Sequence, residues 1–166
     1  PLGPVCPWMD TAKSPDERAQ LLLAASTFDQ KIRWLDEQAA NNPTQTVFSG
    51  VVYSGTQVPC TPIIQYTDGP AAISGGGSGI TAFPSQTALA ATWDIILSRA
   101  KGKAHGYEAF HKHRNVLLGP GLSSGRVPML GRTSEYMGED SLLVGVMAGA
   151  MVRGVQEDNP NEPVEA

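Results

Sequence analysis

The chain has 166 residues, of which 41% are hydrophobic and 17% are charged, and its formal net charge is -4. This apolar fraction can bury a core and the charge is too small to keep the chain expanded, which excludes a disordered chain. No run of residues approaches the ~20 consecutive apolar positions that cross a bilayer. The 12 basic side chains, set against 16 acidic ones, give no footprint for a phosphate backbone. We therefore expect neither a membrane nor a nucleic acid as a partner.

Residues 1–13 are expected to form an irregular N-terminal arm that contains Cys6, and the second cysteine of the chain is Cys60. The two cysteines are compatible with one disulfide or with two buried thiols. We favour the disulfide, because little else would tether the arm. A disulfide would imply an oxidising compartment outside the cytoplasm. Residues 1–10 lack the basic and apolar regions of a signal peptide, so any targeting segment is expected to lie outside this sequence.

The run Ser14-Pro15-Asp16-Glu17 predicts the start of a helix. Ser14 is the expected N-cap, Pro15 suits the first helical position, and Glu17 can reach back to complete a capping box. Apolar residues at spacings of three and four then form one stripe: Leu21, Ala25, Phe28, Ile32 and Leu35. Thr27 and Gln30 form a second possible capping box. The stripe is therefore either one long helix or two short helices that meet near Ser26.

Short apolar runs and helical stretches then alternate along the chain. Strands are predicted at Val47–Tyr53, Ile63–Tyr66 and Val116–Leu118. One helix should open at Thr92-Trp93-Asp94, with Leu97, Ala100 and Ala104 on one face, and a last helix should be capped by Ser141. Residues 157–166 are acidic, contain proline and are expected to form a loop.

This alternation is typical of an α/β fold with a parallel sheet. Polar residues gather where the predicted strands end, as they do in (β/α)₈ barrels. A closed barrel of this type needs ~250 residues, and only two or three strands can be counted here. The sequence therefore predicts the N-terminal portion of an incomplete TIM-type barrel.

Several other chemistries have little support in the sequence. The glycine-rich run at residues 75–79 lacks the Gly-Lys-Ser/Thr of a phosphate loop, and it does not join a strand directly to a helix. His111 and His113 would point about 200° apart on a helix, so they and His105 do not form a metal-binding set. No Gly-x-Ser-x-Gly nucleophile motif occurs. We expect no metal and no organic cofactor.

Three charged residues are better candidates for a binding site. Asp68 follows directly on a predicted strand, before Gly69 and Pro70, where barrels place their chemistry. Its carboxylate could accept hydrogen bonds from two neighbouring ligand hydroxyls, or Asp68 could simply begin a turn. Arg132 and Glu135 are three residues apart after the next strand, so the carboxylate can fix the guanidinium in place. The alternative is an ordinary surface ion pair.

A resemblance to a known family rests on seven segments in a fixed order. They are Asp68-Gly69-Pro70, Ala82-Phe83-Pro84, Leu89-Ala90-Ala91-Thr92-Trp93-Asp94, Leu118-Gly119-Pro120-Gly121, Arg126-Val127-Pro128, the block Gly131 to Asp140, and Arg153-Gly154-Val155-Gln156. Their order and spacing resemble the N-terminal barrel domain of glycoside hydrolase family 3, the β-glucosidase family. The resemblance covers residues 14–156, and the Gly-Arg-x-x-Glu-x-x-Gly-Glu-Asp block is specific.

The resemblance implies a retaining, exo-acting β-glucosidase that hydrolyses terminal β-D-glucosyl residues of a β-glucoside or oligosaccharide. The expected disulfide adds that the protein is secreted. By motif, Asp68 and Arg132 resemble the residues that bind hydroxyls of the terminal sugar, and Glu135 the residue that orients the arginine. In the family, Gly and Arg usually follow the Asp-Gly-Pro, where this chain has Ala71 and Ala72. An additional sugar contact is therefore expected to be missing.

The family's Lys-His pair, Asp nucleophile and Glu acid/base have no counterpart in these 166 residues. A retaining mechanism needs two carboxyl groups ~5 to 5.5 Å apart. We therefore expect the isolated chain to be inactive and to need the remaining part of the hydrolase as its partner. The alternatives are a noncatalytic sugar-binding protein or pseudoenzyme from a shortened gene, and an unrelated nucleotide-binding α/β module.

Overall fold

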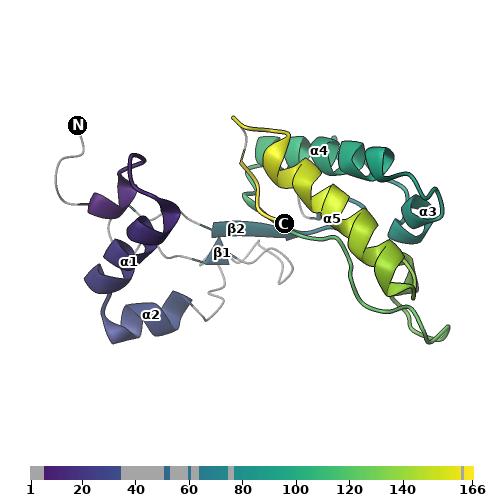
Figure 1. The fold of residues 1–166 in the computed structure, drawn as a ribbon, viewed down its shortest axis with the longest axis horizontal. Helices are drawn as coiled ribbons and strands as arrows, with labels where there is room; N and C mark the ends of the chain where they lie inside the picture. The colour runs from purple at the N-terminus through teal and green to yellow at the C-terminus, as the bar shows by residue number, and fades with distance from the viewer. Residues whose placement is uncertain (1–5, 35–50, 53–59, 61–63, 75–76, 162) are drawn as a thin grey trace. The chain divides into compact units, whose positions relative to one another are not determined.

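The computed structural model describes residues 6–34, 51–52, 60, 64–74, 77–161 and 163–166. The chain divides into two compact units, residues 1–64 and residues 65–166 (Figure 1). The first unit contains η1 (Pro7–Met9), α1 (Pro15–Ala25), α2 (Phe28–Trp34) and β1 (Val51–Val52). The second contains β2 (Ile64–Asp68, from its second residue onward), α3 (Gln86–Ala90), α4 (Ile95–His111), β3 (Val116–Leu118), η2 (Thr133–Glu135) and α5 (Ser141–Glu157). The chain therefore mixes helices with short strands.

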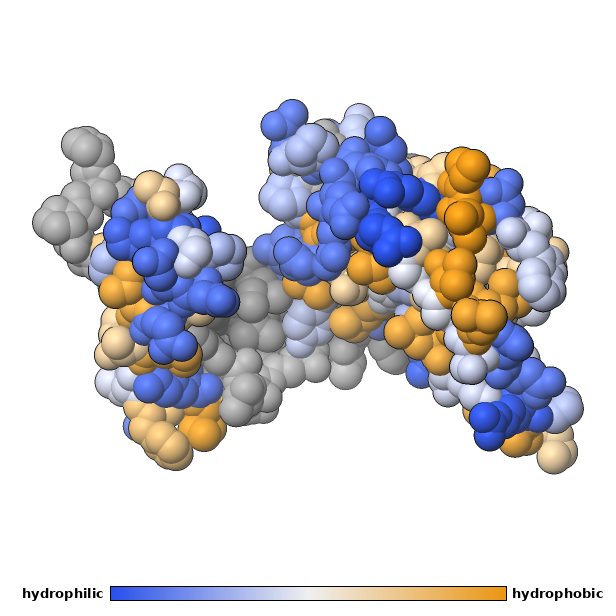
Figure 2. Space-filling model, viewed as in Figure 1, coloured by the Kyte–Doolittle hydropathy of each residue, from blue (hydrophilic) through white to orange (hydrophobic). Residues whose placement is uncertain are grey.

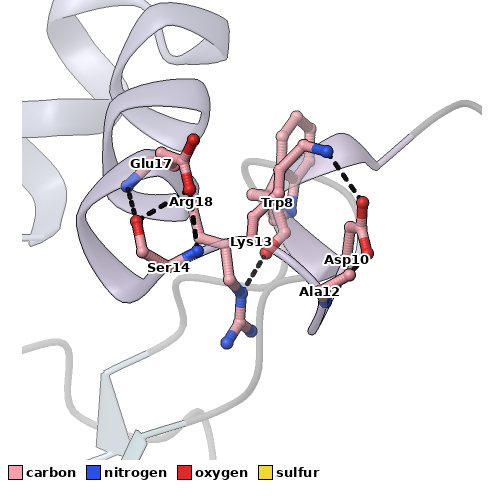
Figure 3. Close-up of polar contacts among 7 residues, drawn as sticks. All are labelled: Trp8, Asp10, Ala12, Lys13, Ser14, Glu17 and Arg18. Atoms are coloured by element: carbon pink, nitrogen blue, oxygen red, sulfur yellow. Dashed lines mark hydrogen bonds and ion pairs between the residues drawn. The ribbon is translucent and has the colours of Figure 1, made fainter.

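The predicted capping box at the start of α1 is confirmed. The Ser14 hydroxyl accepts a hydrogen bond from the Glu17 amide at 3.3 Å, and the Glu17 carboxylate accepts one from the Ser14 amide at 2.9 Å (Figure 3). The apolar stripe forms two short helices, because Thr27 and Gln30 form a second reciprocal pair after Ser26. The second capping box therefore decides between one long helix and two short ones, which the spacing of apolar residues did not.

The small core of the first unit lies between the arm and α1. Cys6 and Trp8 are buried, and Leu21, Leu22 and Cys60 pack against them. A disulfide joins Cys6 to Cys60, with their Cα atoms 6.2 Å apart. The Arg18 guanidinium donates to the Trp8 carbonyl oxygen at 2.7 Å (Figure 3). These contacts tie the arm to α1, although no α1 side chain is fully buried and Phe28 of the predicted stripe is 75% exposed.

Strands β2 and β3 of the second unit pair in parallel, with Tyr66, Thr67 and Asp68 opposite Val116, Leu117 and Leu118. The predicted strand at 116–118 is confirmed, while most of the one predicted at 47–53 lies outside the described residues. Of residues 157–166, those described after Glu157 form turns and irregular backbone, apart from one bridged residue. Glu157 still belongs to α5, and Glu165 forms a parallel bridge with Val116. Val164 is buried there, but a single bridged residue is too short to show the alternation that predicts a strand.

Helices α4 and α5 run side by side and bury a narrow seam (Figure 1). A Cβ on Gly102 would collide with the carbonyl oxygen of Met151, so glycine allows this close approach. The face of α4 expected from Leu97, Ala100 and Ala104 is exposed, and Ser98, Lys101 and His105 face inward instead. The close approach of α5 selects the small residues Ser98 and Gly102. Lys101 instead binds the carbonyl oxygens of Pro70 and Pro84, and the His105 ring lies against Phe83.

Apolar side chains remain on the outer faces of these two helices. Ile96 is 79% exposed and Leu142 is 76% exposed. Figure 2 shows apolar surface over the part of the second unit where α4 and α5 lie. Among the described residues, no helix is both long enough and apolar enough to cross a membrane.

The helix caps agree with the sequence for α4 and differ for α5. Asp94 accepts from the amides of Ile96 and Leu97 at 2.9 and 3.0 Å, as the predicted start implied. For α5 the cap is Asp140, whose carboxylate accepts from the Leu143 amide at 2.7 Å, and Ser141 is the first helical residue. Both residues are good caps, and an ionised carboxylate also favours the positive end of the helix. The short helix α3, capped by Ser85, was not predicted.

Candidate functional site

Asp68 is the last residue of β2 and lies opposite Leu118, the last residue of β3. Two parallel strands therefore end at the same edge, as expected from the sequence. The Asp68 side chain is half-buried. No side chain or amide in the described part of the chain donates a hydrogen bond to its carboxylate. The carboxylate thus keeps its full capacity to accept hydrogen bonds from a ligand.

The backbone around Asp68 is held from several sides. The Ser74 amide donates to the Asp68 carbonyl oxygen at 3.1 Å. A Cβ on Gly69 would collide with the carbonyl oxygen of Ala72 and would lie 3.2 Å from the Leu117 Cδ1 atom, so this position accepts only glycine without rearrangement. The backbone that carries the Asp68 side chain therefore has little freedom.

The carbonyl oxygen of Pro70, two residues beyond Asp68, accepts hydrogen bonds from two buried side chains. Lys101 Nζ donates to it at 3.0 Å, and Gln86 Nε2 donates to it as well. Lys101 is 6% exposed, and burial lowers the pKa of its ammonium group to about 8. Sequence reasoning missed both residues, because a lysine on a helix is normally on the solvated face and Gln86 lies in an element that was not predicted.

Arg132 and Glu135 meet as their spacing suggests. Arg132 Nε lies 3.1 and 3.0 Å from the two Glu135 oxygens, and Arg132 Nη2 lies 2.6 Å from Glu135 Oε2. The Glu135 carboxylate raises the pKa of the Arg132 guanidinium, and Asp68 adds a smaller electrostatic contribution in the same direction. The structure therefore brings Arg132 and Glu135 into direct contact, whereas the charge of Asp68 makes only the smallest contribution to the raised pKa of Arg132.

The segment that carries Arg132 and Glu135 is fixed through its backbone. Thr87 Oγ1 of α3 donates to the Tyr136 carbonyl oxygen at 2.9 Å and lies 3.3 Å from that of Thr133. Tyr136 also forms a parallel bridge with Gly121, just after β3. Arg132 nevertheless remains 70% exposed. Of the five N–H groups of the guanidinium, the one on Nε and one on Nη2 bind Glu135, so three are left for a ligand.

The remaining sequence candidates lie in separate surroundings. Gly77, Ser78 and Gly79 are exposed, and the Lys112 ammonium donates to the Ser78 carbonyl oxygen at 2.6 Å. His105 is fully buried with its ring 5.1 Å from that of Phe83, whereas His113 is exposed. Within the described ranges, no three side chains of His, Cys, Asp or Glu are grouped so as to hold a metal ion.

Comparison with known proteins shows the family of the chain. Residues 40–164 match the glycosyl hydrolase family 3 N-terminal domain. Beta-glucosidase BoGH3A from Bacteroides ovatus is 45% identical over 78 residues, which cover 47% of this chain and 10% of that protein. The chain thus spans about a tenth of the length of this curated relative.

Two solved structures have a similar fold. Beta-glucosidase 3B from Thermotoga neapolitana, in complex with alpha-D-glucose, gives a TM-score of 0.69 at 29% identity over 83% of this chain and 21% of that chain. The beta-glucosidase from Kluyveromyces marxianus, in complex with glucose, gives a TM-score of 0.70 at 28% identity over 84% of this chain and 16% of that chain. Since the family match extends over most of the sequence, the chain belongs to glycosyl hydrolase family 3 and represents its N-terminal domain.

Proposed function

We propose that this chain supplies part of the terminal-sugar subsite of a secreted, retaining, exo-acting β-glucosidase. Asp68 accepts hydrogen bonds from ring hydroxyls of the terminal glucosyl residue, and Arg132 donates to the same ring. Glu135 orients Arg132. The nucleophile and the acid/base are placed outside residues 1–166, so the isolated chain is expected to bind sugar without hydrolysing it.

One observation carries this proposal most directly. The Asp68 carboxylate lies at the carboxyl edge of two parallel strands, receives no hydrogen bond from the described residues, and interacts electrostatically with Arg132. A carboxylate and a guanidinium together offer acceptors and donors to vicinal hydroxyls, which act as both. Hydrogen bonds to ionised groups are about twice as strong as those between neutral groups. The pair is therefore suited to a neutral, hydroxyl-rich ligand.

The order of the elements supports an incomplete (β/α)₈ barrel as the setting of this subsite. Strand β2 leads through α3 and α4 to the parallel strand β3, and β3 leads through α5 to the parallel bridge at Glu165. This is the repeating strand–helix order of such barrels, which place their ligands at the carboxyl ends of the strands. Exposed apolar side chains on α4 and α5, such as Ile96 and Leu142, are consistent with helices that pack against further elements.

The Cys6–Cys60 disulfide supports a location outside the cytoplasm. Disulfides persist in oxidising compartments and are rare in the cytosol, where thiols are kept reduced. We include secretion in the proposal for this reason. Export of the natural protein into the medium or the periplasm would support it, and a protein retained in the cytosol with both thiols reduced would contradict it.

The proposal is tested on the full-length gene product that carries this sequence, with and without Asp68→Asn. Asparagine keeps the size of the side chain and removes its charge. We expect the dissociation constant for D-glucose, measured by calorimetry, to rise about 100-fold, because two charge-assisted hydrogen bonds are weakened. Hydrolysis of para-nitrophenyl β-D-glucoside should fall in parallel in kcat/KM. The matched control is Asp16→Asn on the exposed face of α1, which should change neither value.

The outcomes separate the possible functions. Unchanged glucose affinity in Asp68→Asn would overturn the proposal. Glucose binding without hydrolysis in the full-length gene product would support the noncatalytic sugar-binding protein and exclude the enzyme. Affinity for ATP or NAD in place of glucose would instead support a nucleotide-binding module.

A further inference from the structure

The geometry points to Lys101 and Gln86 as positioning residues that set the Asp68 carboxylate for sugar binding by holding the carbonyl oxygen of Pro70. This inference rests on the proposed function of Asp68. Neither side chain is placed against the sugar. Both act through the Asp68-Gly69-Pro70 turn, and they come from two different helices, Gln86 from α3 and Lys101 from α4.

Two buried donors converge on one acceptor. Lys101 Nζ lies 3.0 Å from the Pro70 carbonyl oxygen and 3.3 Å from that of Pro84, the residue that precedes the Ser85 cap of α3. Gln86 Nε2 donates to the same Pro70 oxygen and lies 3.7 Å from Met151 Sδ of α5. A carbonyl oxygen has two lone pairs, so these donors fill it. The Pro70 peptide is thereby joined to α3, α4 and, through Gln86, α5.

This arrangement is unfavourable if it serves packing alone. Lys101 is 6% exposed and Gln86 is fully buried. No carboxylate among the described residues pairs with the Lys101 ammonium, and Gln86 Oε1 is buried without a partner. Burying an unpaired charge or an unsatisfied amide oxygen destabilises a fold, and apolar side chains of similar volume would avoid both penalties. A positional requirement at the Pro70 oxygen accounts for their presence.

The contacts around the turn hold backbone atoms and leave the Asp68 side chain unpartnered. The Ser74 amide donates to the Asp68 carbonyl oxygen at 3.1 Å, directly after the carboxylate-bearing Cα. Lys101 and Gln86 hold the Pro70 oxygen two residues further along the chain. A backbone turn fixed in this way does not have to be ordered when a ligand arrives, so less backbone conformational entropy is lost on binding. Losing either donor should therefore weaken sugar binding through Asp68.

The test compares glucose affinity of the full-length gene product in single and double variants. Lys101→Met and Gln86→Met keep side-chain length and remove the donors, and Lys101→Gln retains one amide donor. Lys103→Met, two residues further along α4 at an exposed position, is the matched control. We expect about a tenfold rise in the dissociation constant for D-glucose in Lys101→Met and in Gln86→Met, and partial recovery in Lys101→Gln. Lys103→Met should bind like the unaltered protein.

The decisive readout is coupling to Asp68. In an Asp68→Asn background, Lys101→Met should change the dissociation constant by less than about twofold, because its effect passes through the carboxylate that is already altered. An independent, multiplicative effect in the double variant would overturn the inference while leaving the proposed function intact. If Asp68→Asn alone had no effect, the proposed function would fail first. If circular dichroism shows that Lys101→Met does not fold, Gln86→Met is compared alone and in the Asp68→Asn background, with the same criterion.

Discussion

The two charged parts of the candidate site are positioned by opposite means. The Asp68 turn is fixed through its backbone by buried groups, Lys101 and Gln86, while its carboxylate stays without a hydrogen bond from the described residues. Arg132 is instead fixed through its side chain by Glu135 and is 70% exposed. Acidic and basic ligand contacts of one site can therefore depend on different forces. The first should respond to changes in the core and to pH, the second to salt.

The largest expected difference concerns pH, through His105. Burial lowers its pKa from 6.5 to about 4, with a further contribution from the nearby Lys101 charge, and neither ring nitrogen has a hydrogen-bond partner among the described residues. The unfolded chain then takes up a proton first, so stability falls as the pH falls from 6.5 towards 4. A shift of this size corresponds to about 3 kcal/mol. Urea denaturation of His105→Leu should show most of this acid sensitivity removed.

The matched control for His105 is the exposed His113. Its backbone φ is 58°, a left-handed value that asparagine tolerates better than most residues. His113→Asn should keep the acid sensitivity of the unaltered protein. If the free energy of unfolding of the two variants fell equally between pH 6.5 and pH 4, the burial of His105 would not be the cause of the acid sensitivity. The expected dependence on pH would then be wrong.

A smaller effect is expected from glycine substitutions on the two sides of the site. A Cβ on Gly69 would collide with the Ala72 carbonyl oxygen, whereas a Cβ on Gly131, directly before Arg132, meets no atom within 4 Å. Gly69→Ala should reduce the free energy of unfolding by about 1–3 kcal/mol, as overpacking does, and should weaken glucose binding. Gly131→Ala should stay within about 0.5 kcal/mol. Chemical denaturation measures both, and equal losses would mean that the turns are equally tolerant.

The smallest change in stability is expected for Glu135→Gln. Its partner Arg132 is largely exposed, and exposed ion pairs contribute ~0 to 1 kcal/mol. Glucose affinity should fall more clearly, since the guanidinium loses the carboxylate that orients it. The sensitivity of that affinity to added sodium chloride should also fall, because the screened ion pair is gone. A glucose affinity that matches the unaltered protein at low and at high salt would show that Glu135 does not orient Arg132 for the ligand.

What the sequence could predict depends on how far apart the interacting residues lie. Ser14 and Glu17, or Arg132 and Glu135, are three residues apart, so their contacts follow from spacing alone. Asp68 could be placed at a strand end because the apolar run and the Gly-Pro turn are adjacent to it. The charged residues of the candidate site could therefore be predicted from the sequence.

The residues that support the turn could not be predicted, because their partners are distant in sequence. Lys101 and Pro70 are 31 residues apart, and Gln86 and Pro70 are 16 apart. A lysine between alanine and glycine carries no local sign that it will be buried. The inward face of α4 was also missed, since the contact with α5 selects small and polar side chains where periodicity favours apolar ones. Tertiary packing decided both cases.

The position of β3 between two parallel neighbours has a consequence for solvent exchange of its amide protons. The Asn115 amide donates to Gln65, towards β2, and the Leu117 amide donates to Glu165, towards the C-terminal segment. Two amides in one short stretch therefore sit in different ladders. Their deuterium uptake rates, resolved residue by residue, measure separately how often each ladder opens, so this short stretch reports on both edges of the strand that ends beside the candidate site.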